Sequence, residues 1–183
     1  MLGAILIKQI IGGEIMPSGN EYDELNISQM PAIEVLKKLG YIYMPAEEAE
    51  ALRGNLYNVI LKDVLYSKLT EINRYEYKGK HYHFSNKNIN QAMQDIDEAL
   101  TDGLVKTNEK IYDALMLGRS YTEKLPDNEG FRSFDIDYID WQDPYNNVFH
   151  VVEEFRVERE DGQGTIRPDI VLFVNGIPFA VIE

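Results

Sequence analysis

Apolar residues in the first part of the chain recur at the spacing of an amphipathic helix. Pro31–Leu39 carries them three and four positions apart, and Gly40 is expected to end this helix. The same spacing predicts three further helices, the last two with their first residue as N-cap: Pro45–Ile72, Asn86–Leu100 and Thr107–Leu117.

Alternation of apolar and polar residues replaces helical spacing toward the end of the chain. The expected strands, with an Asn175-Gly176 turn between the last two, are Phe131–Trp141, Val148–Val157, Ile166–Val174 and Ile177–Glu183. The last two are apolar at nearly every position, which is typical of a sheet covered on both faces. Weak alternation around Gly79 also predicts a short hairpin over Tyr75–Phe84.

These patterns predict an α/β fold, with α+β as the alternative. A mostly helical portion, residues 1–130, is expected to pack on a small mixed β-sheet formed by residues 131–183, in a single domain over residues 1–183. The sequence stops in the middle of what should be a buried central strand. Because domain boundaries fall in exposed segments, we expect a fragment of a longer protein.

Composition narrows the class of protein. A hydrophobic content of 44% is that of a globular domain, and no apolar run approaches the length of a membrane span. Lys8 interrupts the apolar run Met1–Ile11, which we interpret as the edge of a helix or strand rather than a signal peptide. The absence of cysteine disfavours a disulfide-stapled secreted domain and a thiolate metal site, so a cytoplasmic protein is expected.

The net charge of −13 disfavours simple nucleic-acid binding, which needs clustered Lys and Arg. Two explanations would keep nucleic acid as a substrate. Another domain or subunit would hold the DNA, or the carboxylates would themselves bind cations.

Asp169 and Glu183 are the candidate catalytic and metal-binding residues. Both are carboxylates at the edges of strongly apolar strands, where an unpaired charge is costly. Sharing one Mg²⁺ would remove that cost, because hard cations take oxygen ligands. The ion could then polarise a phosphate and help deprotonate a water. The alternative is structural: Asp169 is a turn acid after Pro168, and Glu183 is a solvated residue.

Strand register decides whether these two carboxylates share a face of the sheet. With a plain two-residue Asn175-Gly176 turn, Asp169 would pair with Ile182 and Glu183 would lie on the opposite face. A three-residue turn with Gly176 as the bulge residue would bring Glu183 to the face of Asp169. The functional interpretation therefore predicts a bulged turn, or another irregularity that restores the parity.

The sequence of Arg167–Glu183 (RPDIVLFVNGIPFAVIE) closely resembles the nuclease motif in the N-terminal region of the restriction (R) subunit of type I restriction-modification enzymes. Those domains belong to the PD-(D/E)xK nuclease superfamily. The resemblance extends more loosely upstream through Phe149–Val157. There the family often has Asn-Gln before the Phe, whereas Glu153 and Glu154 precede Phe155 here. Whether Glu154 takes a role of that Gln is open.

This resemblance implies a restriction-endonuclease-like core and Mg²⁺-dependent cleavage of DNA, with Asp169 and Glu183 as metal ligands. The family's motif continues with a Lys two residues past the Glu, so the 183-residue fragment is expected not to cut DNA alone. Glu34 and Glu154 are candidate accessory acids, and Arg167 is a candidate DNA contact. Modification (M) and specificity (S) subunits are the implied partners. ATP and S-adenosylmethionine are expected only for the full-length complex.

Other polar features favour structural explanations. His81 and His83 share one face of an extended segment, but no third ligand is near in sequence, so a surface strand is expected. The acidic run Asp135–Asp143 is predicted to be a solvated face. Two rival functions remain: a nuclease fold that has lost its chemistry and serves as a protein-interaction scaffold, and a repair or resolvase nuclease of the same superfamily.

Overall fold

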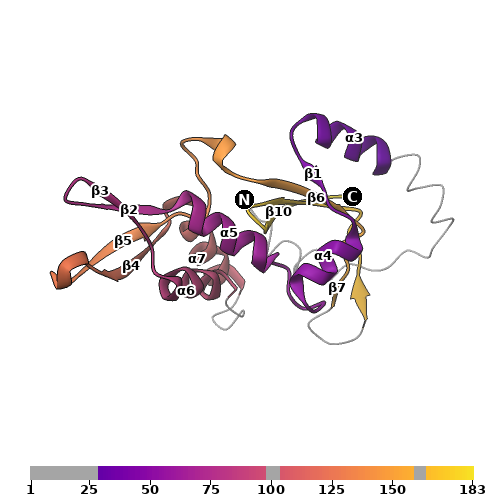
Figure 1. Cartoon of the computed structure of the whole chain (residues 1–183). Coiled ribbons are helices and arrows are strands. Elements are labelled where there is room, and N and C mark those ends of the chain that lie inside the picture. The colour runs from indigo at the N-terminus through magenta and orange to yellow at the C-terminus, as the bar shows by residue number, and fades with distance from the viewer. Residues whose placement is uncertain (1–28, 98–103, 159–163) are drawn as a thin grey trace. The chain divides into compact units, whose positions relative to one another are not determined.

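The computed structural model describes residues 29–97, 104–158 and 164–183, and within 104–108 only the backbone. The chain divides into two compact units, whose elements are labelled in Figure 1. One unit combines the chain up to Leu61 with Val148–Glu183, and the other spans Lys62–Asn147. These units cut across the boundary that the sequence suggests between residues 130 and 131. Met1–Ile11 lies outside the described residues.

The first unit contains a mixed four-stranded sheet in the order β1-β6-β9-β10. The edge strand β1 runs parallel to β6, and the other neighbours are antiparallel. The described elements of this unit are α3 (Met30–Lys38), β1 (Ile42–Tyr43), α4 (Ala46–Arg53), β6 (Phe149–Glu153), β7 (Val157–Glu158), β8 (Thr165–Ile166), β9 (Ile170–Val174) and β10 (Ile177–Ile182).

Helix α3 covers one face of this sheet. Its apolar side chains Ile33 and Leu36 form a buried cluster with Val151 of β6 and Ile170 of β9. Since side chains alternate along a strand, the neighbouring residues of β6 and β9 lie on the opposite face.

A buried arginine ties α4 to the chain that follows β6. Arg53 is 2% exposed, and its guanidinium lies 4.1 Å from the centre of the Phe155 ring. It also donates hydrogen bonds to the carbonyls of Asn58 and Arg156. Burial lowers the pKa of Arg53 to about 10 against the opposing effect of Glu50, so the side chain stays charged at neutral pH.

The second unit combines helices with two antiparallel hairpins. Its described elements are α5 (Lys62–Ile72), β2 (Arg74–Tyr77), β3 (Lys80–His83), α6 (Asn86–Ile96), α7 (Leu104–Leu117), β4 (Arg119–Lys124) and β5 (Phe131–Ile136). The hairpins pack through stacked rings of Tyr75 and Phe134, whose centres are 4.5 Å apart. The buried carboxylate of Glu123 accepts hydrogen bonds from Ser85 and Asn88, which joins β4 to the start of α6.

The α/β class predicted from the sequence is confirmed, because helices accompany parallel and antiparallel strand pairs. The restriction-endonuclease-like core stays a prediction. The hairpin predicted over Tyr75–Phe84 is confirmed as β2 and β3. Among the described residues, no helix combines the length and hydropathy needed to cross a membrane.

Several predicted helix boundaries were wrong, among them the end of the helix predicted over Asn86–Leu100, which stops at Ile96. The predicted helix Pro45–Ile72 is two helices, because Gly54 ends α4 with a left-handed φ of 77°. Ser85 rather than Asn86 is the N-cap of α6, accepting a hydrogen bond from the Asn88 amide. Helix α7 begins at Leu104, so Thr107 lies inside it and is not its cap.

Candidate functional site

Asp169 stands directly before the central strand β9. It follows the buried Pro168, and its own side chain is exposed. The carbonyl of Asp169 accepts a hydrogen bond of 2.9 Å from the amide of Glu154, which extends the pairing of β6 with β9 by one position. The backbone of Asp169 is therefore held by the sheet, while its carboxylate is open to solvent.

Glu183 follows the last residue of β10, and its side chain is also exposed. The final ladder pairs are Val181 with Val171 and Ile182 with Ile170. Continued by one position, this register places Glu183 directly opposite Asp169, on the same face of the sheet. Directly opposed residues of antiparallel strands have Cβ atoms about 4.5–5.5 Å apart.

The turn itself is not bulged, so that form of the prediction was wrong, but its alternative, another irregularity that restores the parity, is confirmed. Asn175 and Gly176 form a plain two-residue turn with left-handed φ values of 52° and 80°, and Ile177 pairs with Val174. The extra residue is Phe179, since the register shifts between Pro178 and Ala180. This bulge in β10 restores the parity that the turn was expected to supply.

Asn175 holds the turn between β9 and β10 against the start of β6. The side chain of Asn175 is buried and accepts a hydrogen bond of 2.9 Å from the backbone amide of Val148. The backbone amide of Asn175 donates one of 2.8 Å to the Val148 carbonyl. These bonds anchor the turn end of β9 and β10 against β6. Beyond the turn, the Phe179 bulge sets which residues of β9 and β10 share a face.

Glu154 lies beside Asp169 in the same row across the sheet. It has a left-handed φ of 48°, a conformation that is strained for a residue with a side chain. Its carboxylate is 3.4 Å from a guanidinium nitrogen of Arg167, two residues before Asp169. The predicted accessory acid and the predicted DNA contact are thus paired with each other.

Glu34 lies on α3, which packs against the face that carries Val151 and Ile170. By alternation, Asp169 belongs to the opposite face. The carboxylate of Glu34 is exposed and forms an ion pair of 2.7 Å with Lys37. This hydrogen bond and charge hold the pKa of Glu34 below its ordinary value. The structure therefore does not bring Glu34 beside Asp169.

Two polar residues of β6, the half-buried Glu153 and the buried His150, have surroundings that the sequence did not indicate. The carboxylate of Glu153 accepts a hydrogen bond from the Tyr43 hydroxyl, and burial together with Glu153 raises the pKa of Tyr43. The second oxygen of Glu153 is buried and has no hydrogen-bond partner among the described residues. His150 is 8% exposed, and burial lowers its pKa, which favours the neutral imidazole. Their place in an otherwise apolar strand was the available signal.

The histidine pair predicted to be a surface feature lies on β3 of the other unit. His81 and His83 are both exposed, and a ring nitrogen of His83 lies 2.7 Å from the Arg74 guanidinium. Within residues 29–97, 104–158 and 164–183, no group of three His, Asp or Glu side chains is close enough to hold a metal ion. Asp169 and Glu183 thus form a two-carboxylate arrangement without a third acidic or imidazole ligand from the described chain.

A family model described as the N terminus of the type I restriction enzyme R protein matches residues 21–183. Two similar proteins come from Methanocaldococcus jannaschii. One, named as a type I restriction enzyme MjaVIIIP endonuclease subunit, is 30% identical over 154 residues, which are 82% of this chain and 13% of that protein. The other, named as a type I restriction enzyme MjaIXP endonuclease subunit, is 27% identical over 191 residues, 98% of this chain and 17% of that protein.

The chain therefore spans less than a fifth of the length of either relative. The family model, by contrast, covers nearly the whole sequence, including every element of the four-stranded sheet and both candidate carboxylates. The chain belongs to the family of type I restriction enzyme R protein N termini.

Proposed function

We propose that the chain is the DNA endonuclease region of a type I restriction enzyme R subunit. In this proposal Asp169 and Glu183 bind Mg²⁺ and carry phosphodiester hydrolysis, as in PD-(D/E)xK nucleases. Membership of the R protein family supports the class of reaction. The observation that carries the site is the Phe179 bulge, because it aligns the two carboxylates across β9 and β10.

The donor set fits Mg²⁺. This ion is commonly held by one or two carboxylates, with waters and substrate phosphate filling its other positions. Two exposed carboxylates on one face, without histidine or cysteine nearby in the sheet register, match that preference. When bound, the ion would polarise a phosphate oxygen and lower the pKa of a water.

The remaining residues of the row would position the ligands. Glu154 holds the main chain of Asp169 through its amide, and its carboxylate fixes Arg167. In the proposed site Arg167 keeps a positive charge near the incoming phosphate, while Glu154 restrains its position. The lysine that the family's motif places two residues after Glu183 would share the face of Glu183 by strand alternation.

The wider assembly follows from the same proposal. DNA is the substrate, and modification and specificity subunits are the partners that select and hold it. Such partners would account for a catalytic region with a net charge of −13, since they would supply the basic residues that contact the DNA phosphates. ATP and S-adenosylmethionine would be used by other parts of that complex.

The test is cleavage of supercoiled plasmid by the intact R subunit in its complex, with Mg²⁺ supplied. Asp169→Asn and Glu183→Gln should each lower the cleavage rate more than about a hundredfold, because even groups that only support a metal ligand are worth about 10–100-fold. Glu47→Gln, an exposed acid on α4, is the matched control and should leave the rate unchanged. Cleavage by either site variant at the rate of the unmodified complex would refute the assignment.

A further inference from the structure

The Lys62–Asn147 unit contains a pocket with a mixed lining. It has a volume of about 290 Å³, at the low end of the range for small-ligand sites, and a size suited to one side chain. The lining residues come from three places in the unit: the end of α5, the end of α7 and the segment after β5. They are Ile72, Met116, Asp137, Ile139, Asp140, Trp141 and Gln142.

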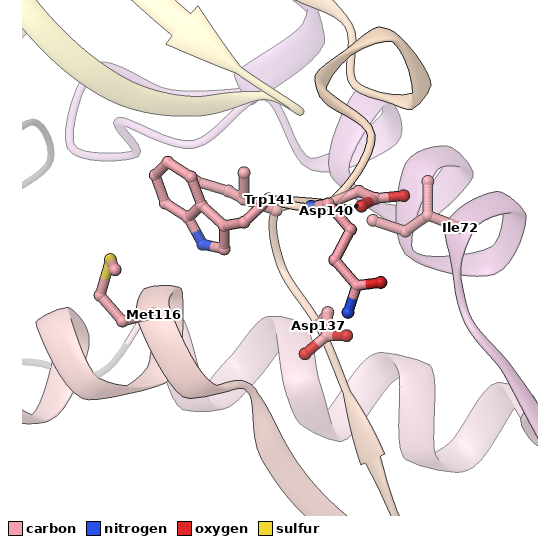
Figure 2. Close-up of a pocket in the computed structure, with 7 residues that line it drawn as sticks. Ile72, Met116, Asp137, Asp140 and Trp141 are labelled. Atoms are coloured by element: carbon pink, nitrogen blue, oxygen red, sulfur yellow. Dashed lines mark hydrogen bonds between the residues drawn. The ribbon is translucent and has the colours of Figure 1, made fainter.

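Apolar and aromatic side chains form part of the pocket lining, beside its polar groups. Figure 2 shows Met116 and the Trp141 ring on one side and Ile72 on the other, with the Asp137 carboxylate between them. Trp141 is 47% exposed and Met116 is 42% exposed. The indole N–H of Trp141 donates to the Leu115 carbonyl at 2.8 Å, which fixes the orientation of the ring at the end of α7.

Two helix C-termini meet this pocket. Ile72 is the last residue of α5, and Met116 is the penultimate residue of α7. The carbonyl end of a helix carries a partial negative charge, which a Lys or Arg in the last turn commonly offsets. Neither helix has a basic residue in its last turn. The backbone therefore makes the pocket electronegative before any side-chain charge is counted.

Asp137 adds a carboxylate that no cation from the described part of the chain offsets. Among the described residues, no side chain forms an ion pair or hydrogen bond with it, although its backbone is held by two hydrogen bonds of 2.8 Å to the Asn73 amide group. Removal of water, followed by the charges of Asp135 and Asp140, raises the pKa of Asp137. A cationic group in the pocket would stabilise the ionised carboxylate.

Asp140, the other acid in the lining, has a structural task. Its oxygens accept hydrogen bonds from the amides of Gln142 and Asp143 and from the Asn146 side chain. The Asn146 bond is the largest cause of a lowered pKa, so Asp140 stays ionised and adds negative charge while it shapes the loop. Asp137 is thus the lining acid whose carboxylate is open to a ligand.

We propose that this pocket receives an arginine or lysine side chain presented by a protein partner. The Trp141 ring offers a face for a cation–π contact, Met116 and Ile72 cover the aliphatic stem, and Asp137 pairs with the charge. Exposed Trp and Met beside a pocket are also typical of the centre of protein interfaces. DNA is disfavoured as the occupant, since helix C-termini and carboxylates repel phosphate.

The single tryptophan of the chain makes occupancy measurable by intrinsic fluorescence. The whole chain would be titrated with a short arginine-glycine peptide, and in parallel with the same peptide carrying citrulline, a neutral isostere of arginine. A saturable change in Trp141 emission is expected with arginine only. Asp137→Asn should weaken that binding about tenfold or more, because it removes a charge-assisted contact. Asp113→Asn, an exposed acid of α7 outside the pocket, is the matched control and should leave the affinity within about twofold.

Several results would overturn the assignment. They are equal binding of the citrulline peptide, unchanged affinity after Asp137→Asn, and absence of a saturable signal with either peptide. A short DNA duplex that changes Trp141 emission would identify nucleic acid as the occupant instead. Self-association that Asp137→Asn abolishes would identify a second copy of the chain. Since the metal ligands lie in the other unit, failure here would leave the nuclease proposal intact.

Discussion

Two exposed carboxylate sites of this chain differ in what surrounds the acid. In the sheet unit, Asp169 faces Glu183 across antiparallel strands, and Glu154 completes the row. In the Lys62–Asn147 unit, Asp137 has an aromatic ring, a thioether and two helix C-termini for neighbours. Paired oxygens suit a hard metal ion, whereas one carboxylate beside an aromatic face suits an organic cation. The surroundings, rather than the acid, determine the class of ligand.

The register of β10 is the most sensitive point of this comparison. Deleting Phe179 should remove the bulge and move Glu183 to the opposite face from Asp169, with both carboxylates still present. Binding of Mn²⁺, followed by electron paramagnetic resonance, should fall about as far as in Glu183→Gln, since one ligand is lost in either case. Phe179→Ala keeps the residue count and is the control, with circular dichroism to confirm folding. Undiminished Mn²⁺ binding after the deletion would disconnect the bulge from the site.

Gly118→Ala should disturb the pocket and leave the metal ligands untouched. A Cβ at Gly118 would lie 2.6 Å from a carboxylate oxygen of Asp137 and 2.7 Å from the Ile136 carbonyl, at a left-handed φ of 69°. We expect thermal or urea unfolding to show a loss of about 1–3 kcal/mol, the usual cost of such strain. Gly79→Ala is the comparison, since its φ is 73° but nothing lies within 4 Å. Equal losses at both glycines would show that the contacts with Asp137 and the Ile136 carbonyl carry no energy.

Glu154→Gln should have a moderate effect on the metal site. The substitution removes the ion pair with Arg167 but keeps the backbone bond to Asp169. Mn²⁺ affinity is expected to fall about tenfold, the lower range for residues that support a metal ligand. Peptide binding at the Asp137 pocket should not change. A larger loss than that of Asp169→Asn would make Glu154 a ligand in its own right.

Asp137→Asn should produce the smallest effect, a gain of stability at neutral pH. The folded-state pKa of Asp137 is raised, so the folded chain holds its proton more tightly than the unfolded chain does. Stability therefore falls as pH rises from the unfolded pKa through the folded pKa, and the cost persists above both. Asn removes this cost, and its advantage should vanish at pH values below the unfolded pKa. Urea unfolding across acidic and neutral pH tests this, and a variant less stable at neutral pH would contradict it.

Periodicity predicted the elements with a continuous apolar pattern. Helix α3 and strand β10 lie close to where the sequence placed them, whereas the strand predicted over Ile166–Val174 is divided into β8 and β9. The break after α4 was missed because the apolar residues between Gly54 and Lys62 keep the helical spacing, and only the left-handed glycine stops the helix. Strand β4 was missed because its buried side chains include a charged one, Glu123, whose partners on α6 are remote in sequence.

The sequence indicated which residues form the candidate site, but not the position of the bulge that aligns them. Asp169 and Glu183 stand out because charges are rare at apolar strand ends, yet their alignment depends on one inserted residue. Pro178 was the available signal, since proline within a sheet is confined to edges and bulges. The pocket around Asp137 was hidden within an acidic run, because tertiary packing separates the loop-forming Asp140 from the open carboxylate of Asp137.

The most direct test is a Mn²⁺ titration of the isotope-labelled chain followed by amide line broadening in NMR spectra, because the paramagnetic ion broadens the signals closest to it. The proposed site requires the earliest loss of signal at the amides of residues 169, 170, 182 and 183, with Glu154 close behind and the amides around Asp137 and Trp141 unaffected at the same concentration. Broadening centred on the Asp137 pocket, or spread evenly over exposed acids, would contradict the claim that the Phe179 bulge builds a metal site from Asp169 and Glu183.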